Sequence, residues 1–136
     1  MRIVLDTNVL VSALINPHGP PAIIVANVLA ERLIVVYDER ILHEYRAVLV
    51  RPRFGFDSAT VDTLLRSMEA GGEVVVPQPL ALTLPDPDEL AFIEVAEAAL
   101  VAGLVTGNAR DYVPISGQFR VPVYTPAAFV REIAAS

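Results

Sequence analysis

Short apolar runs along the chain alternate with longer stretches in which apolar residues recur every three to four positions. The runs are rich in Val, Leu and Ile and predict buried strands, whereas the longer stretches have the periodicity of helices packed on one face. The predicted strands are residues 2–5, 33–37, 73–76, 104–106 and 121–124, and the predicted helices are residues 8–15, 22–31, 38–50, 57–70, 86–102 and 125–133. Because strands and helices alternate, we expect an α/β fold with a central parallel sheet of four to five strands and helices on both faces.

Polar side chains occur where two of the predicted strands end. Asp6 and Asn8 follow the first strand, and Thr106, Asn108 and Asp111 end or follow the fourth. In an open parallel sheet the functional crevice lies beyond the carboxyl ends of the strands, which is where these groups are expected. A purely structural interpretation stays open for both segments. Asp6 or Asn8 would cap the next helix, and the residues after Thr106 would form an ordinary glycine-containing turn.

Glu44 lies beside the apolar stripe of its predicted helix. It comes three residues after Ile41 and four before Val48, so it stacks next to them rather than opposite them. Helix edges also tolerate glutamate at the surface, so this position alone does not decide between a site and a solvated face.

Glu89 is the acidic residue with the most unusual predicted position. It opens a helix that is apolar on nearly all sides and whose exposed side we expect to be marked by Glu94 and Glu97. Glu89 is in line with Ile93 and Ala96, so its carboxylate is expected on the buried face. A buried charge needs a cation or hydrogen-bond donors, because leaving it unpaired is costly.

A capping box is the structural alternative for Glu89. Asp86 would be the N-cap, Pro87 the first helical residue, and Glu89 would accept from the backbone N–H of the cap. Asp88 then remains unexplained, because three acids in four residues exceed what capping requires.

The acidic residues together predict a cation site. If Asp6, Glu44 and Glu89 meet in one crevice, they repel one another unless a cation neutralises them. Carboxylate and amide oxygens in a chain without Cys suit Mg²⁺ or Mn²⁺. His18 lies among prolines and His43 points about a quarter-turn away from Glu44, so we expect neither to bind the metal.

Length and composition indicate a single domain over residues 1–136. The chain is 54% hydrophobic and 19% charged, as expected for a globular protein. No apolar run approaches the ~20 residues that span a bilayer, and the N-terminus lacks the features of a signal peptide. We therefore expect a soluble, cytoplasmic protein with no membrane partner.

The net charge and the positions of the basic residues bear differently on nucleic-acid binding. A net charge of −6 argues against broad nucleic-acid binding. All ten basic residues are nevertheless Arg, which pairs phosphate bidentately and stacks on bases. Four of them lie within fourteen positions and are candidates for binding a nucleic-acid backbone: Arg40, Arg46, Arg51 and Arg53. A solvated helix face is the alternative interpretation of this cluster.

The ordered set of these motifs resembles the PIN-domain family, and within it the bacterial toxins of the VapC type. The resemblance covers essentially the whole chain. Its segments are Val4 to Ser12, Glu44, Asp86 to Glu89 with the following apolar helix, Leu104 to Asn108, and Tyr124 to Phe129. It implies a three-layer α/β/α fold and Mg²⁺- or Mn²⁺-dependent hydrolysis of RNA by an acidic cluster.

The resemblance also implies roles for individual residues. Asp6 is the first acid of the family pattern, with Asn8 beside it, and Glu44 is the second. The third is Glu89 or Asp88, of which the helical phase favours Glu89. The fourth acid of the family follows the Thr-Gly pair that begins at Thr106, where this chain has Asn108. Asn108 is able to coordinate through its carbonyl oxygen but brings no charge, so a second metal would bind more weakly, and Asp111 is a possible substitute.

Two further expectations follow from the resemblance, a cognate antitoxin that blocks the crevice and a homodimer. Because Asn108 departs from the pattern, a catalytically weakened PIN-like module that binds RNA or protein is the alternative function. A phospho-acceptor domain of the receiver type is disfavoured, because the chain has no Lys and no acid after its third strand.

Overall fold

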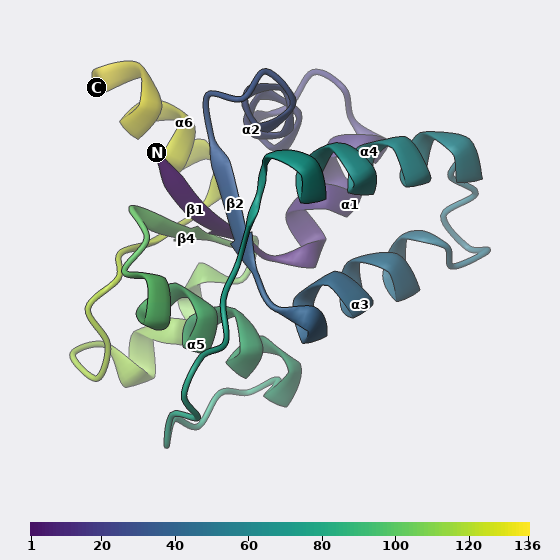
Figure 1. The fold of residues 1–136 in the computed structure, drawn as a ribbon. Helices are drawn as coiled ribbons and strands as arrows, with labels where there is room; N and C mark the ends of the chain where they lie inside the picture. The colour runs from purple at the N-terminus through teal and green to yellow at the C-terminus, as the bar shows by residue number, and fades with distance from the viewer.

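The computed structural model describes residues 1–136 as a five-stranded parallel sheet between layers of helices (Figure 1). The strands are β1 (Arg2–Leu5), β2 (Ile34–Tyr37), β3 (Glu73–Val74), β4 (Gly103–Val105) and β5 (Val123–Tyr124). They lie in the order β3-β2-β1-β4-β5, and every neighbouring pair is parallel. The expected three-layer α/β/α arrangement is therefore confirmed.

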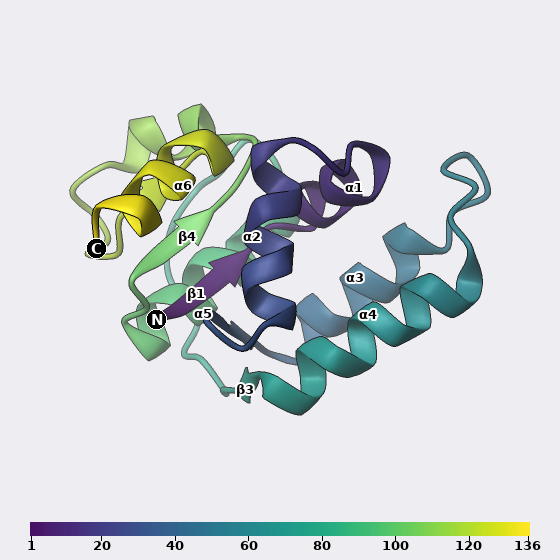
Figure 2. The same cartoon turned by 90° about the horizontal axis from the view of Figure 1, so that it is seen from above.

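Six α-helices and two 3₁₀ helices surround the sheet. The α-helices are α1 (Thr7–Ile15), α2 (Pro20–Leu29), α3 (Glu39–Leu49), α4 (Ser58–Gly71), α5 (Leu90–Ala99) and α6 (Pro126–Ala135), and the 3₁₀ helices are η1 (Pro87–Glu89) and η2 (Ala109–Ile115). Helices α2 and α6 cover one face of the sheet, α5 covers the other, and α3 and α4 form a hairpin on the β2 side (Figures 1 and 2). No single helix is long and apolar enough to cross a membrane; only α1 and α2 taken together, with a bend of 103° between them, reach that length and composition.

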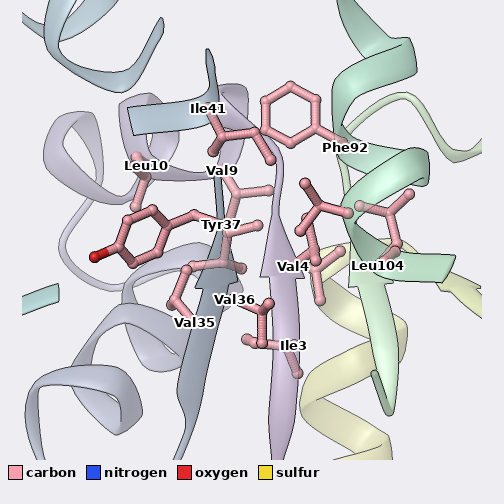
Figure 3. Close-up of a cluster of buried hydrophobic side chains, with 14 of the residues drawn as sticks. Ile3, Val4, Val9, Leu10, Val35, Val36, Tyr37, Ile41, Phe92 and Leu104 are labelled. Atoms are coloured by element: carbon pink, nitrogen blue, oxygen red, sulfur yellow. The ribbon is translucent and has the colours of Figure 1, made fainter. Parts of the chain in front are cut away.

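The sheet is buried on both faces because its central strands carry apolar residues at nearly every position, Arg2 at the start of β1 being the exception. Ile3 and Val4 point to opposite faces of β1, and both are fully buried (Figure 3). They belong to one cluster of 32 buried residues that also includes Ile41 from α3 and Phe92 from α5. The core therefore continues from the sheet into α3, which carries Glu44, and into α5, which directly follows Glu89 at the end of η1.

The strand order reverses at β1, and this reversal fixes where a crevice opens. Strands β2 and β3 extend the sheet on one side of β1, whereas β4 and β5 extend it on the other. The loops that leave β1 and β4 consequently diverge to different layers, which leaves a crevice beyond their carboxyl ends. Asp6 follows β1 directly and Thr106 follows β4 directly.

The segment before β4 differs from its prediction. The helix expected to reach Ala102 ends at Ala99, because Leu100 has a left-handed backbone with φ of 48°. The chain then turns into β4, which begins at Gly103. A Cβ at Gly103 would lie 2.8 Å from the ring of Tyr124, so the Tyr124 ring packs where a larger residue would place its side chain.

Glu94 and Glu97 do not mark an exposed side of α5, contrary to the prediction. Glu94 is 4% exposed and accepts hydrogen bonds from Arg40 Nη1 at 2.8 Å and from the backbone N–H of Leu80 at 2.7 Å. Glu97 accepts from the backbone N–H groups of Arg120 and Val121. Loops distant in sequence cover this side of α5, and the helical periodicity carries no information about them.

We expect Glu94→Ala to lower the free energy of unfolding by about 2–3 kcal/mol, because the substitution leaves the Arg40 Nη1 group and the Leu80 N–H without their acceptor. The measurement is urea unfolding followed by circular dichroism. Glu132→Gln, at an exposed position of α6, is the control and should stay within about 0.5 kcal/mol of the unmodified protein. An equal effect of the two substitutions would contradict the role of the Glu94 hydrogen bonds.

Candidate active site

A pocket of about 490 Å³ opens beyond the carboxyl ends of β1 and β4. Four apolar residues line it, and the rest of its lining is polar or charged. It gathers residues from α1, α3, the α3–α4 loop, η1 and the β4–η2 turn. The predicted site residues that line it are Asp6, Asn8, Glu44, Asp88, Glu89, Asn108, Arg51 and Arg53.

Asp6 is held by the strand that lies next to its own. Its backbone N–H donates to Val105 of β4 at 2.9 Å, and its carboxylate accepts from the Thr106 hydroxyl at 2.7 Å. Asp6 occupies the N-cap position of α1, but its side chain makes no capping hydrogen bond. Burial raises the pKa of the Asp6 carboxyl, and the bond from Thr106 opposes this rise only in part.

Glu44 reaches the pocket from α3. Its carboxylate accepts a hydrogen bond from the Thr7 hydroxyl at the start of α1. The next residue, Tyr45, is fully buried and donates its hydroxyl hydrogen to the Leu5 carbonyl at 2.6 Å, which ties α3 to the end of β1. Burial raises the pKa of Glu44, and the charge of Asp6 raises it further.

Glu89 lies on the buried face, as its helical phase predicts. It is 4% exposed, and its Oε1 accepts only a long bond of 3.4 Å from Asn108 Nδ2. Its Oε2 is buried and accepts no hydrogen bond. Burial, followed by the charge of Asp111 and a hydrogen bond that protonated Glu89 donates to Asp111, raises the pKa of Glu89 to about 7.

The capping box predicted for Glu89 does not form. Asp86 does cap, but its carboxylate accepts from the Asp88 N–H at 3.0 Å, and the Glu89 side chain does not return to the cap. The first turn is the 3₁₀ helix η1, and α5 begins only at Leu90. Asp88 is exposed at the pocket rim, and Asp86 lines the pocket as well.

The turn after β4 is ordered by hydrogen bonds to the pocket residues. The Thr106 hydroxyl accepts from the Asn108 N–H at 3.0 Å, while Asn8 Oδ1 accepts from the Gly107 N–H at 3.1 Å. Asn8 and Thr106 therefore hold the two strand ends together. The residues expected to form an ordinary turn continue into the 3₁₀ helix η2, which carries Asp111 beside the pocket rather than in its lining.

The structure divides the predicted arginine cluster into two pairs. Arg40 forms ion pairs with Asp38 and Glu94, and Arg46 lies 3.8 Å from a Glu69 carboxylate oxygen. Neither of these two arginines lines the acidic pocket. Arg51 and Arg53 do line it, and neither forms an ion pair.

The donor set suits a hard divalent cation, but the side chains as placed do not enclose one. Carboxylate and amide oxygens line the pocket, and the unpartnered Glu89 Oε2 offers a free acceptor to a ligand. No group of three or more His, Asp or Glu side chains is arranged so that it could hold a metal ion. The Glu44 carboxylate is bound to the Thr7 hydroxyl instead.

Comparison with known proteins identifies the family. The PIN domain profile matches residues 2–110, which is most of the chain. The chain belongs to the PIN domain family. An uncharacterized protein of Methanocaldococcus jannaschii, MJ1680, is 28% identical to it over 142 residues, which cover 97% of this chain and 91% of the relative.

A solved structure shows the same PIN fold. A chain of VapBC2 from Rickettsia felis, solved bound to a DNA fragment from their promoter, superposes with a TM-score of 0.56. The match covers 92% of this chain and 98% of that chain, at 17% sequence identity. At this identity the likeness concerns the fold, and the pocket residues are argued from this chain alone.

Sequence reasoning did not assign six of the lining residues to the site of this PIN domain, among them Asp86, Thr7 and Phe54. Asp86 was interpreted only as a cap, although the run of acids around it is unusual. Thr7 gave no signal, because its role depends on the approach of α3. Phe54 did give one, since it follows Arg51 and Arg53 closely and aromatic residues among arginines are typical of nucleic-acid surfaces.

The raised pKa of Glu89 predicts a decline in stability with pH in protein kept free of metal by EDTA. The folded state binds the Glu89 proton more tightly than the unfolded state does. The stability that this proton contributes is therefore complete below about pH 4.5 and is lost by about pH 7. Glu89→Gln removes the titration, so at pH 7 the variant should be more stable than the unmodified protein by on the order of 3 kcal/mol. At pH 4.5 the two should be nearly equal.

Urea unfolding at a series of pH values measures this difference. Glu132→Gln, at an exposed position, should leave the pH dependence unchanged. A Glu89→Gln protein whose stability follows that of the unmodified protein at every pH would contradict the raised pKa.

Proposed function

We propose that this PIN domain is a metal-dependent endoribonuclease that hydrolyses phosphodiester bonds of RNA. The observation that carries the proposal is the buried Glu89 carboxylate, which lines the same pocket as Asp6 and Glu44 and whose Oε2 accepts no hydrogen bond. Membership of the PIN domain family supports it. A buried acid of this kind is costly for the fold, so a ligand that uses it is the simplest reason for its presence.

Asp6, Glu44 and Glu89 would hold Mg²⁺ or Mn²⁺, with Asp88 and Asn108 at the rim as further oxygen donors. The bound cation would polarise the phosphoryl oxygens and lower the pKa of an attacking water. Thr106 orients the Asp6 carboxylate through its hydroxyl hydrogen bond.

Arg51 and Arg53 would bind the phosphates of the RNA. They are the only basic residues in the pocket lining, and both lack an acidic partner. Arg40 and Arg46 are left out of this role, because their guanidinium groups already pair with carboxylates. A substrate would therefore approach the acids from the side of the α3–α4 loop.

A role as the toxin of a toxin–antitoxin pair is part of the proposal, together with a cognate antitoxin and a homodimer. Its support is the fold shared with a chain of VapBC2 from Rickettsia felis and the VapC-type motifs of the sequence. A gene for a small DNA-binding protein directly upstream would support this role.

The second candidate function is a PIN module with weak or no catalysis. Asn108 favours it, because an amide replaces the acid that the family pattern has at this position and donates to Glu89 instead of adding charge. The cleavage assays below separate the two functions, since a non-catalytic module would bind RNA without cutting it.

The first test is cleavage of single-stranded RNA by purified protein. We expect cleavage with Mg²⁺ or Mn²⁺ and none with EDTA. Asp6→Asn should lose most of the activity, by on the order of a hundredfold or more, because it removes a charged ligand, and its melting temperature should be equal or higher because repulsion among the acids decreases. Undiminished cleavage in EDTA, or a fully active Asp6→Asn protein, would rule out the proposed mechanism.

The second test decides between Glu89 and Asp88 as the third acid. Glu89→Gln keeps an acceptor for Asn108 but removes the charge that a cation needs, so it should abolish cleavage and weaken Mn²⁺ binding in calorimetry. Asp88→Asn, at an exposed rim position, should have the smaller effect on both. The reverse order of effects would make Asp88 the third acid.

A further inference from the structure

The loop between α3 and α4 places a stack of aromatic rings and a guanidinium group beside the acidic pocket. The rings of Phe54 and Phe56 are nearly parallel, with an angle of 8° and centroids 5.3 Å apart. The Arg53 guanidinium carbon lies 4.7 Å from the centroid of the Phe54 ring. We call these three side chains the loop stack.

The backbone of the loop fixes this arrangement. The Phe54 N–H donates to the Arg51 carbonyl, and the Gly55 N–H donates to the Pro52 carbonyl, each at 3.1 Å. Gly55 has φ of 62°, a conformation that glycine adopts without strain, and it separates the two phenylalanines. The stack is therefore held by turn hydrogen bonds.

Packing of the core does not account for Phe54. Phe56 packs against the hydrophobic core, whereas Phe54 is half-buried and is not among the residues packed there. Phe54 and Arg53 instead line the acidic pocket. Most of the pocket lining is polar or charged, so the apolar ring of Phe54 in that lining needs another explanation.

The loop stack combines the features with which proteins bind unpaired nucleobases. Bases stack on aromatic rings and on guanidinium planes, while nearby arginines neutralise the phosphates. Arg51 and Arg53 supply that charge, and no carboxylate competes for them. The remainder of the pocket is acidic and repels phosphate, so the loop is the side on which a nucleic-acid strand is attracted.

We infer that Arg53, Phe54 and Phe56 form a base-stacking subsite that holds one unpaired nucleotide of a single-stranded RNA next to the acidic pocket. Arg51 pairs the adjoining phosphate. This inference rests on the proposed nuclease function and assigns to the loop stack the binding of one base beside the acids. Paired bases are already stacked within a duplex, so double-stranded RNA does not use the subsite.

The test is binding of a single-stranded RNA that carries one 2-aminopurine, whose fluorescence is quenched when the base stacks. EDTA is present throughout, so binding is measured without cleavage. We expect quenching with the unmodified protein and with Phe54→Tyr, which keeps the aromatic face. Phe54→Leu should lose the quenching and bind roughly 5- to 150-fold more weakly. A duplex of the same sequence should bind weakly to all of these proteins.

Arg53→Gln tests the subsite without touching a half-buried residue. It should weaken binding and lower the slope of log affinity against log salt by about 0.7. Arg66→Gln is the matched control, because Arg66 is exposed on α4 outside the pocket and pairs only with Asp62. It should change neither quantity. Melting temperatures establish that each variant is folded.

The outcomes separate this inference from the nuclease proposal. Unchanged affinity and quenching in Phe54→Leu and in Arg53→Gln would overturn the base-stacking subsite, whatever the protein cleaves. Failure of the unmodified protein to bind single-stranded RNA would overturn it as well. Loss of quenching in Phe54→Leu, in a protein that cleaves no RNA with either metal, would support the subsite and reject the nuclease.

Discussion

The accumulation of negative charge at the carboxyl ends of β1 and β4 is the constraint on which the pocket depends. Asp6, Glu44 and Glu89 have raised pKa values because burial removes water from each carboxylate and the neighbouring acids add repulsion. Threonine hydroxyls compensate Asp6 and Glu44, whereas Glu89 keeps one oxygen without a partner. Apolar residues of similar size would make a more stable fold, so the acids are best explained by a ligand that binds there.

The sheet topology determines which side chains share this environment. The reversal of strand order at β1 opens the crevice, and hydrogen bonds then fix the approach of the helices around it. The Tyr45 hydroxyl donates to Leu5 at the end of β1, and the Tyr112 hydroxyl donates to the Glu89 carbonyl at 3.4 Å. Two buried tyrosines thus help to hold the acids of α3 and η1 toward Asp6.

The packing of the helices also determines which arginines form ion pairs. Arg40 is used to join α3 to the buried Glu94 of α5, and Arg46 joins α3 to α4 through Glu69. Arg51 and Arg53 follow the end of α3, where no carboxylate lies near enough to pair with them. The arginines within α3 thus form ion pairs, whereas those beyond its end do not.

The sequence by itself determined the order of elements, the parallel sheet and the positions of Asp6 and Glu89, because strand ends and helical phase are local properties. It did not determine that Glu94 is buried, that Arg40 is paired, or that the capping box fails. Each of these depends on a contact between segments far apart in the chain, such as Leu80 with Glu94. The packing of helices and loops against one another determines which polar groups meet, and only the tertiary structure shows that packing.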